Sequence, residues 1–279
     1  QRNAAIQRIV RSENEDLKAE LLPELIGNSL FATVGISHLT TSRQHWKTPT
    51  VAVEPVDAGF ILRGVIPWVT GADQADIIVS GGQLEDGKQV LLALETSSAG
   101  VAVDEAAPLM ALNASRTSSV RLDGVFVPWS QLLHGPTEHV MQQGGLTGAG
   151  THTTSALAIG HAASSIDLLR TEAERRPELN EILDLFTAEH ADLLSDLYAA
   201  AQAEGADLPE CQSTESMRRR SNSLALRAAQ AGLAATKGAG FVTGHRASRL
   251  VSEAMFFLVW SCPQPVVLSH LRELAVAHG

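Results

Sequence analysis

The spacing of apolar residues divides the chain into three stretches. Over residues 4–26, apolar side chains recur at three- and four-residue steps, the helical period, and Gly27 ends that pattern. Residues 50–127 hold short β-branched runs separated by Asp-Gly, Gly-Gly and proline signals, which predicts strands. Beyond them, Ala- and Leu-rich segments of helix length predominate, over residues 156–175, 179–203, 217–237, 246–260 and 266–277.

The order of these stretches predicts the α+β class, because helices and strands come in separate blocks and do not alternate. Strands at this spacing are typical of a sandwich or barrel. The later segments predict a bundle of about four helices. A glycine-rich linker over residues 142–150 separates the two regions. We therefore expect an N-terminal helical segment (residues 1–45), a middle β-domain (46–141) and a C-terminal helical bundle (142–279).

Composition excludes several classes of protein. The chain carries 31 acidic and 21 basic residues, a formal net charge of −10, which argues against binding nucleic acid or an anionic membrane. Its longest apolar run, residues 255–260, is far shorter than the ~20 residues of a membrane-spanning helix. No signal peptide is visible, and Cys211 and Cys262 have no Cys or His at metal-ligand spacing. We expect a cytoplasmic protein without a metal site.

Short catalytic signatures are absent from the sequence: it contains no nucleophile elbow, Walker loop, HExxH or CxxC. One local pattern points to a ligand. Trp68 is followed two residues later by Thr70, and in a strand these side chains share one face. An indole beside a hydroxyl suits a planar heteroaromatic ligand, through stacking and a hydrogen bond. A core tryptophan of a β-barrel is the alternative interpretation.

Longer segments resemble the acyl-CoA dehydrogenase flavoprotein family. The segments FILRG (60–64), WVTGADQAD (68–76), LMALNASRT (109–117) and VRLDGVFVP (120–128) resemble its middle β-domain in order and spacing. Downstream, residues 173–175 and the KGAGF turn (237–241) resemble its arginine-containing segment and its glycine-rich turn. The resemblance extends from about residue 27 to the end. It implies that residues 1–45 are the remnant of the family's N-terminal helical domain, most of which is missing from this sequence.

The resemblance implies FAD as cofactor. Trp68 would lie along the flavin ring, and Thr70 would form a hydrogen bond near its reactive nitrogen. Ile36 and Ser37 occupy the place of a family loop that carries a Thr-Glu-Pro triplet, and Ser37 keeps a hydroxyl for the flavin.

The resemblance also implies a homodimer or homotetramer, because the family's cofactor site is completed by a neighbouring chain. Arg175 and the turn containing Gly238 and Gly240 would meet the phosphate or ribose of that chain's FAD, since arginine forms a phosphate fork and glycine allows close approach. The alternative interpretation is that Arg175 is an ordinary charged residue on the solvent-exposed side of a helix.

The position of the catalytic base is the main departure from the family. Its dehydrogenases use a carboxylate to remove the substrate's α-proton, most often a Glu just after the penultimate helix. That place falls at Ser261 or Trp260, and a second family position falls near Thr154 and Ser155. A hydroxyl cannot replace a carboxylate without an activating partner. Glu253 lies two helical turns upstream, displaced by roughly 10 Å, and is a weak candidate. The catalytic residue therefore stays unassigned.

The resemblance therefore implies an FAD-dependent oxidoreductase that acts on an acyl thioester, with acyl-CoA as one candidate, or on a related small organic substrate. Two alternatives stay open. One is a catalytically degenerate scaffold or assembly protein of the same fold. The other is a flavin-dependent oxidase or monooxygenase, whose chemistry starts from reduced flavin and oxygen and does not require the glutamate.

Overall fold

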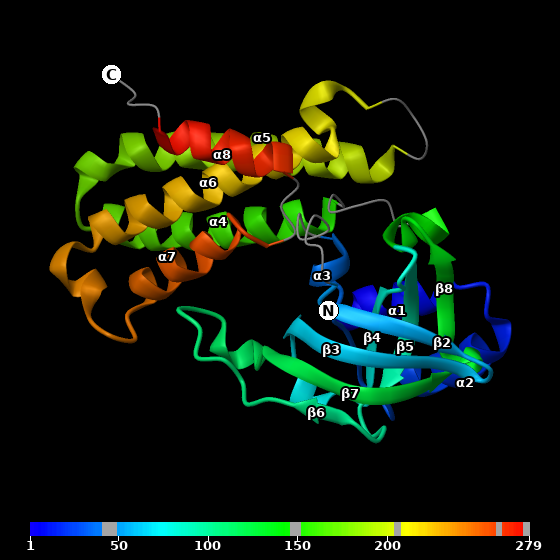
Figure 1. The fold of residues 1–279 in the computed structure, drawn as a ribbon. Coiled ribbons are helices and arrows are strands. Elements are labelled where there is room, and N and C mark those ends of the chain that lie inside the picture. The colour runs from blue at the N-terminus through cyan, green and yellow to red at the C-terminus, as the bar shows by residue number, and fades with distance from the viewer. Residues whose placement is uncertain (41–48, 146–151, 204–207, 261–263, 276–279) are drawn as a thin grey trace. The chain divides into compact units, whose positions relative to one another are not determined.

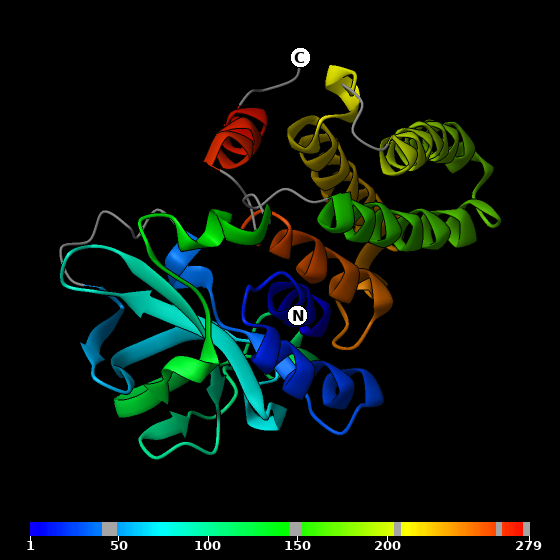
Figure 2. The same ribbon diagram turned by 90° about the vertical axis from the view of Figure 1, so that its right-hand side faces the viewer.

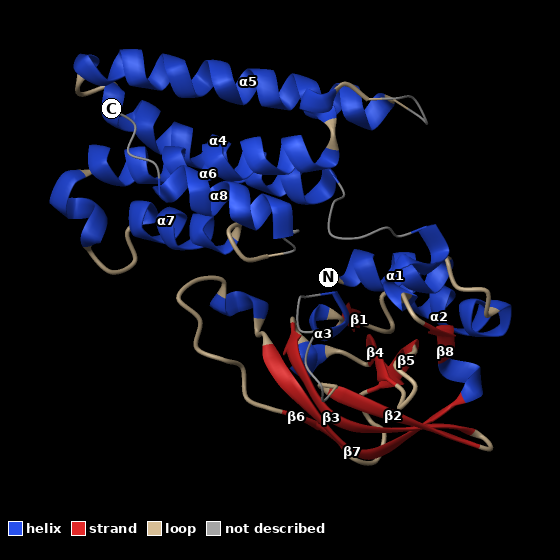
Figure 3. Ribbon diagram, turned by 45° about the horizontal axis from the view of Figure 1, so that its top comes forward, coloured by secondary structure: helices blue, strands red, loops and turns tan. Residues whose placement is uncertain are grey.

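The computed structural model describes residues 1–40, 49–145, 152–203, 208–260 and 264–275. The chain divides into two compact units, Gln1–Gly148 and Ala149–Gly279. The first unit is built around a β-sheet and the second from helices (Figure 1 and Figure 3). The predicted α+β class is therefore confirmed. The finer division at residues 45 and 141 stays a prediction.

Two helices open the first unit, α1 (Arg2–Val10) and α2 (Glu15–Gly27), where the apolar spacing predicted one. Asn14 Oδ1 accepts a hydrogen bond from the Leu17 amide (3.1 Å), and Ser12 Oγ donates to the Leu133 carbonyl (2.8 Å). Such bonds from short polar side chains to the backbone compete with the helical ladder, so the chain breaks and restarts. The second helix ends at Gly27, as predicted.

The described residues of the first unit form one eight-stranded sheet. Its strands are β1 (Ala32–Val34), β2 (Val51–Val56), β3 (Gly59–Val69), β4 (Ile77–Gln83), β5 (Gln89–Glu95), β6 (Val101–Val103), β7 (Ser118–Pro128) and β8 (Leu132–Thr137). The order across the sheet is β6-β7-β3-β2-β4-β5-β8, and β1 pairs in parallel with β4. The apolar runs did not predict β1 or β8. The runs at 120–122 and 125–127 belong to one strand, β7.

Short helical segments lie between or directly after these strands. They are α3 (Ser37–Thr40) and the 3₁₀ segments η2 (Ala72–Gln74), η3 (Asn113–Ser115), η4 (Trp129–Gln131) and η5 (Val140–Gly145).

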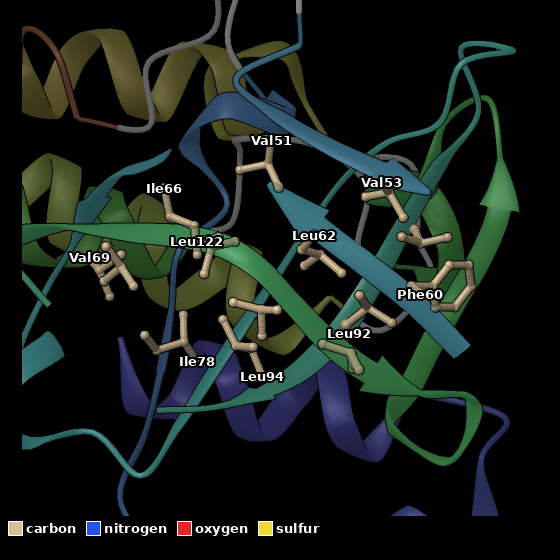
Figure 4. Close-up of a cluster of buried hydrophobic side chains, with 14 of the residues drawn as sticks. Val51, Val53, Phe60, Leu62, Ile66, Val69, Ile78, Leu92, Leu94 and Leu122 are labelled. Carbon is tan, nitrogen blue, oxygen red and sulfur yellow. The ribbon is translucent and has the colours of Figure 1, made fainter. Parts of the chain in front are cut away.

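The core of the first unit has two apolar layers, because β4 and β5 are buried on both faces. Ile78 and Leu92 point into a cluster with side chains of β2, β3 and β7 (Figure 4). Ile77 and Val79 point the other way, into a cluster with the apolar faces of α1 and α2. Strands buried on both faces are continuously apolar, which explains the unbroken run at residues 90–94.

The second unit contains α4 (His152–Ala173), α5 (Asn180–Gln202), α6 (Thr214–Ala235), α7 (Arg246–Phe256) and α8 (Gln264–Ala275), with 3₁₀ turns η6 (Pro177–Leu179), η7 (Glu210–Gln212) and η8 (Lys237–Phe241). The predicted helices are confirmed, although α7 ends four residues earlier than expected. Small residues let α4 and α6 approach closely: a Cβ on Gly232 would lie 3.3 Å from Leu168 Cδ2. Figure 2 shows α6 between α5 and α8.

Candidate functional site

The end of β3 contains a bulge that aims Trp68 outward. Ile66 pairs with Val120 and Val69 pairs with Ser118. Three residue steps along β3 therefore correspond to two residue steps along β7. An extra residue shifts the side-chain alternation. Val69 is consequently fully buried, whereas Trp68 is 53% exposed, which excludes a core role for this indole within the first unit. Thr70, directly after the strand, is half-buried. Trp68 and Thr70 are the two neighbours of Val69, so in the side-chain alternation they share the direction opposite to that of Val69.

A row of hydroxyls continues from Thr70. Its Oγ1 lies 3.3 Å from Thr117 Oγ1, which lies 2.8 Å from Ser115 Oγ. The Gly71 amide donates to the Ser115 carbonyl (2.9 Å), joining the end of β3 to the start of β7. Hydroxyls both donate and accept, so the row presents adaptable polar groups near an exposed indole. Sequence reasoning missed Ser115 and Thr117, although their two-residue spacing before a strand was a usable signal.

An exposed ion pair holds the loop beside this row. Arg116 donates to Asp73 Oδ2 through Nε (2.6 Å) and through Nη2. These hydrogen bonds lower the pKa of Asp73 and raise that of Arg116. Arg116 has a positive φ of 46°, a conformation that side chains other than glycine rarely adopt. The ion pair therefore orders η2 and η3 on either side of the hydroxyl row.

The predicted cofactor residues Ile36 and Ser37 lie beside the face of β3 that carries the buried Ile66. A Cβ on the preceding Gly35 would lie only 2.6 Å from Ile66 Cγ2, so a larger residue there would displace the chain. The Thr33 hydroxyl donates to the Thr70 carbonyl (2.7 Å) and ties β1 to the end of β3. The structure thus brings these residues, Trp68 and Thr70 into one part of the first unit.

His38 follows Ser37 and is 8% exposed. Its Nε2 lies 2.9 Å from the Gly81 carbonyl oxygen. Burial lowers the pKa of His38, and the bond to Gly81 partly opposes this effect. The imidazole therefore favours its neutral form and anchors α3 to β4.

In the second unit, Arg175 is exposed and lies just past the end of α4, not within the helix as predicted. Its neighbour Arg176 is held: Nη2 donates to the Ala235 carbonyl and to Glu172 Oε2 (2.9 Å). Because Ala235 is the last residue of α6, this contact brings the ends of α4 and α6 together. Arg175 and the Gly238–Gly240 turn therefore share one end of the helical unit.

The two predicted glycines of that turn differ in their surroundings. Gly238 is exposed, and a Cβ there would meet nothing within 4 Å. Gly240 is buried, and a Cβ there would lie 2.2 Å from Thr236 Oγ1 and 2.7 Å from Leu233 Cδ1. Packing within this chain accounts for the glycine at position 240. At Gly238 the backbone is exposed, so a ligand can approach it closely.

Of the two candidate bases, Ser261 lies outside the described residues. Glu253 lies on α7, with Oε2 3.7 Å from His161 Nε2 on α4 and Oε1 3.7 Å from Arg249 Nε. The His161 ring also contacts Phe257 edge to face. Burial lowers the pKa of His161, while Glu253 and the Leu250 carbonyl oppose the shift. Glu253 is thus a partly buried carboxylate engaged between two helices.

In the described part of the chain, no cluster of three or more His, Cys, Asp or Glu residues is arranged to hold a metal ion. Among the described helices, none combines the length and apolar character needed to span a bilayer.

No family model matches this sequence. Solved structures do match its fold. A glutaryl-CoA dehydrogenase from Mycobacterium smegmatis in complex with FADH2 superimposes with a TM-score of 0.77 at 18% identity, over 98% of this chain and 74% of that one. An acyl-CoA dehydrogenase from Geobacillus kaustophilus gives 0.79 at 15% identity, over 96% and 75%. The chain has the acyl-CoA dehydrogenase fold.

The match includes both units, because nearly the whole chain is aligned. FkbI, a protein for biosynthesis of the methoxymalonyl extender unit of the polyketide Fk520, has the same fold with a TM-score of 0.72 at 19% identity, over 99% of this chain and 78% of that one. The acyl-CoA dehydrogenase fold therefore accommodates sequences that retain little identity with this one, so the fold alone does not fix which residues form each site.

Proposed function

We propose that this protein is an FAD-dependent oxidoreductase acting on an acyl thioester or a related small organic substrate. The observation that carries the proposal is the outward-facing Trp68 beside the Thr70–Thr117–Ser115 hydroxyl row. It occurs in a fold shared with a glutaryl-CoA dehydrogenase that binds FADH2. An exposed indole with adjacent hydroxyls fits a flat ring that bears hydrogen-bonding edges.

The residues present fit FAD at both ends of the cofactor. Bound FAD would supply the hydride acceptor for oxidation of the substrate. Trp68 would stack on the flavin, and Thr70 would bind its polar edge. Gly238, whose Cβ position is open, and the exposed Arg175 would receive the phosphate or ribose of a cofactor bound by a second copy of the chain. This arrangement requires a homodimer or homotetramer, which light scattering tests directly.

The experiment for the flavin site compares FAD binding in the parent and in a Trp68→Ala/Thr70→Ala variant. Loss of the stacking surface should weaken binding by about 1–3 kcal/mol, visible as reduced flavin absorbance after purification and as a higher Kd by fluorescence titration. Trp129→Ala is the matched control. Its indole is 41% exposed but packs on Phe60 and donates to the Asp57 carbonyl. Equal flavin retention in the double variant and the parent would refute the site.

The catalytic base requires a separate test. We propose that the family's base position falls at Ser261 and that the chain lacks a carboxylate there. In the FAD-loaded protein, Ser261→Glu should raise acyl-CoA turnover about 10²–10⁴-fold, measured by dye reduction. Glu253→Gln should change turnover little. An active parent enzyme that Glu253→Gln inactivates would instead assign the base to Glu253.

The alternative functions appear as outcomes of the same measurements. If the purified protein contains no flavin and cannot be loaded with FAD, the result would indicate a catalytically degenerate scaffold or assembly protein. FAD-loaded protein that stays inactive with thioesters, but consumes oxygen when its flavin is reduced by NADH, would indicate an oxidase or monooxygenase.

A further inference from the structure

We infer that a groove on the helical unit binds a small phosphorylated ligand. The groove lies where α5, α6 and α8 meet, and its open space is about 480 Å³, within the range of small-molecule sites. Every residue lining it belongs to the described part of the chain. They are Glu189, Arg219, Arg220, Ser223, Arg227, Ser269, Arg272 and Glu273.

The charge of the groove opposes that of the protein. Four arginines and two glutamates line it, a formal sum of +2, in a chain whose net charge is −10. Two of the arginines are neutralised: Arg220 pairs with Asp196 (2.6 Å) and Arg227 pairs with Glu189 (2.5 Å). Across the described residues, no ion pair or hydrogen bond engages the side chain of Arg219 or Arg272, and both residues are exposed. Two guanidinium groups therefore remain available to a ligand.

The groove is held in place by its own hydrogen bonds. Ser223 Oγ donates to Glu273 Oε1 (2.5 Å), which links α6 to α8, and accepts a bond from Arg227 Nε (3.2 Å). Arg219, Ser223 and Arg227 follow at four-residue steps, so they lie along one face of α6. Arginine forks match the oxygens of a phosphate better than other cations do. The arrangement is therefore prepared for an anion with several oxygens.

The size and edges of the groove favour a compact ligand. Glu189 and Glu273 flank the arginines and would repel the continuing charges of a long acidic polypeptide. The groove is also separate from the proposed flavin contacts. Gly238 follows Arg227 by eleven positions along the chain, about 16 Å at the rise of an α-helix. A phosphorylated ligand can therefore occupy this groove whether or not the chain binds flavin.

Pyrophosphate titrated into the full-length protein by calorimetry tests the groove. Arg219→Gln/Arg272→Gln should weaken binding about 10- to 100-fold, since two charge-assisted bonds are lost. The charge-matched control is Arg63→Gln/Arg170→Gln, which removes two exposed arginines elsewhere and should leave Kd unchanged. Arg175→Gln should also leave it unchanged, which separates this site from the flavin site.

A second variant gives a shift in the opposite direction. Glu189→Gln removes the partner of Arg227 and a negative charge from the rim, so pyrophosphate should bind several-fold more tightly. This gain keeps the test decisive if the arginine variant misfolds. Absence of pyrophosphate binding to the parent at millimolar concentration would overturn the inference, as would equal weakening in both arginine pairs or binding only of a poly-glutamate peptide.

Discussion

Gly238 and Gly240 are two residues apart and are expected to respond differently to the same substitution. Gly240→Ala places a methyl group against Thr236 and Leu233, so we expect it to lower the free energy of unfolding by about 1–3 kcal/mol, the usual cost of overpacking. Gly238→Ala adds a Cβ that meets nothing within 4 Å. It should leave stability nearly unchanged and weaken FAD binding. Urea unfolding and flavin titration measure the two effects.

Gly160 provides a control for the general effect of removing glycine. It lies within α4, and a Cβ there meets nothing within 4 Å. Gly160→Ala should therefore stabilise the protein by about 0.5–1 kcal/mol, because alanine loses less entropy in a helix. A Gly240→Ala protein as stable as the parent would show that the η8 turn adjusts without cost.

At the scale of elements, the break between α1 and α2 depends on Asn14. Its side chain accepts from the Leu17 amide and donates to the carbonyls of Ser130 (2.8 Å) and Leu132 (3.0 Å). Asn14→Ala removes both the helix cap and this link to the start of β8. We expect a loss of about 1–2 kcal/mol in the free energy of unfolding, measured by urea titration.

The matched control is Asn3→Ala, because Asn3 is exposed within α1. It should change stability by less than about 0.5 kcal/mol. If Asn14→Ala costs no more than Asn3→Ala, the two helices are separated by something other than this cap.

At the scale of the whole molecule, four buried or partly buried imidazoles make stability depend on pH. Burial lowers the pKa of His38, His134, His161 and His270. The unfolded chain, with ordinary imidazole pKa values of about 6.5, therefore binds more protons than the folded protein at mildly acidic pH. The contribution of these imidazoles to the free energy of unfolding is therefore fully present above pH ~6.5 and is lost as the pH drops below that value.

Urea unfolding at pH values of about 7.5 and 5.5 should show this loss of stability. His38→Gln should reduce the difference between the two conditions, because one of the four groups is removed. The control is His139→Gln, which replaces an exposed histidine without altering the buried ones. A protein more stable at the acidic pH would contradict the sign of the prediction.

Several features followed from local patterns alone. Helical periodicity identified the five helices among the described residues of the second unit, and continuous β-branched runs identified β2 to β7. Both signals arise between residues close in sequence, where side-chain direction repeats every 3.6 or 2 residues. The pairing of Trp68 with Thr70 as a candidate ligand contact was visible for the same reason.

Other features were decided only by tertiary structure, because they depend on bonds between distant residues. Trp68 faces outward because β3 carries an extra residue relative to β7. Thr117 reaches Thr70 across 47 positions, and Arg176 reaches the Ala235 carbonyl across 59. The three-residue β1 has too short a pattern to detect and exists through its pairing with β4. Local sequence sets which elements form, whereas long-range hydrogen bonding and packing set which side chains meet.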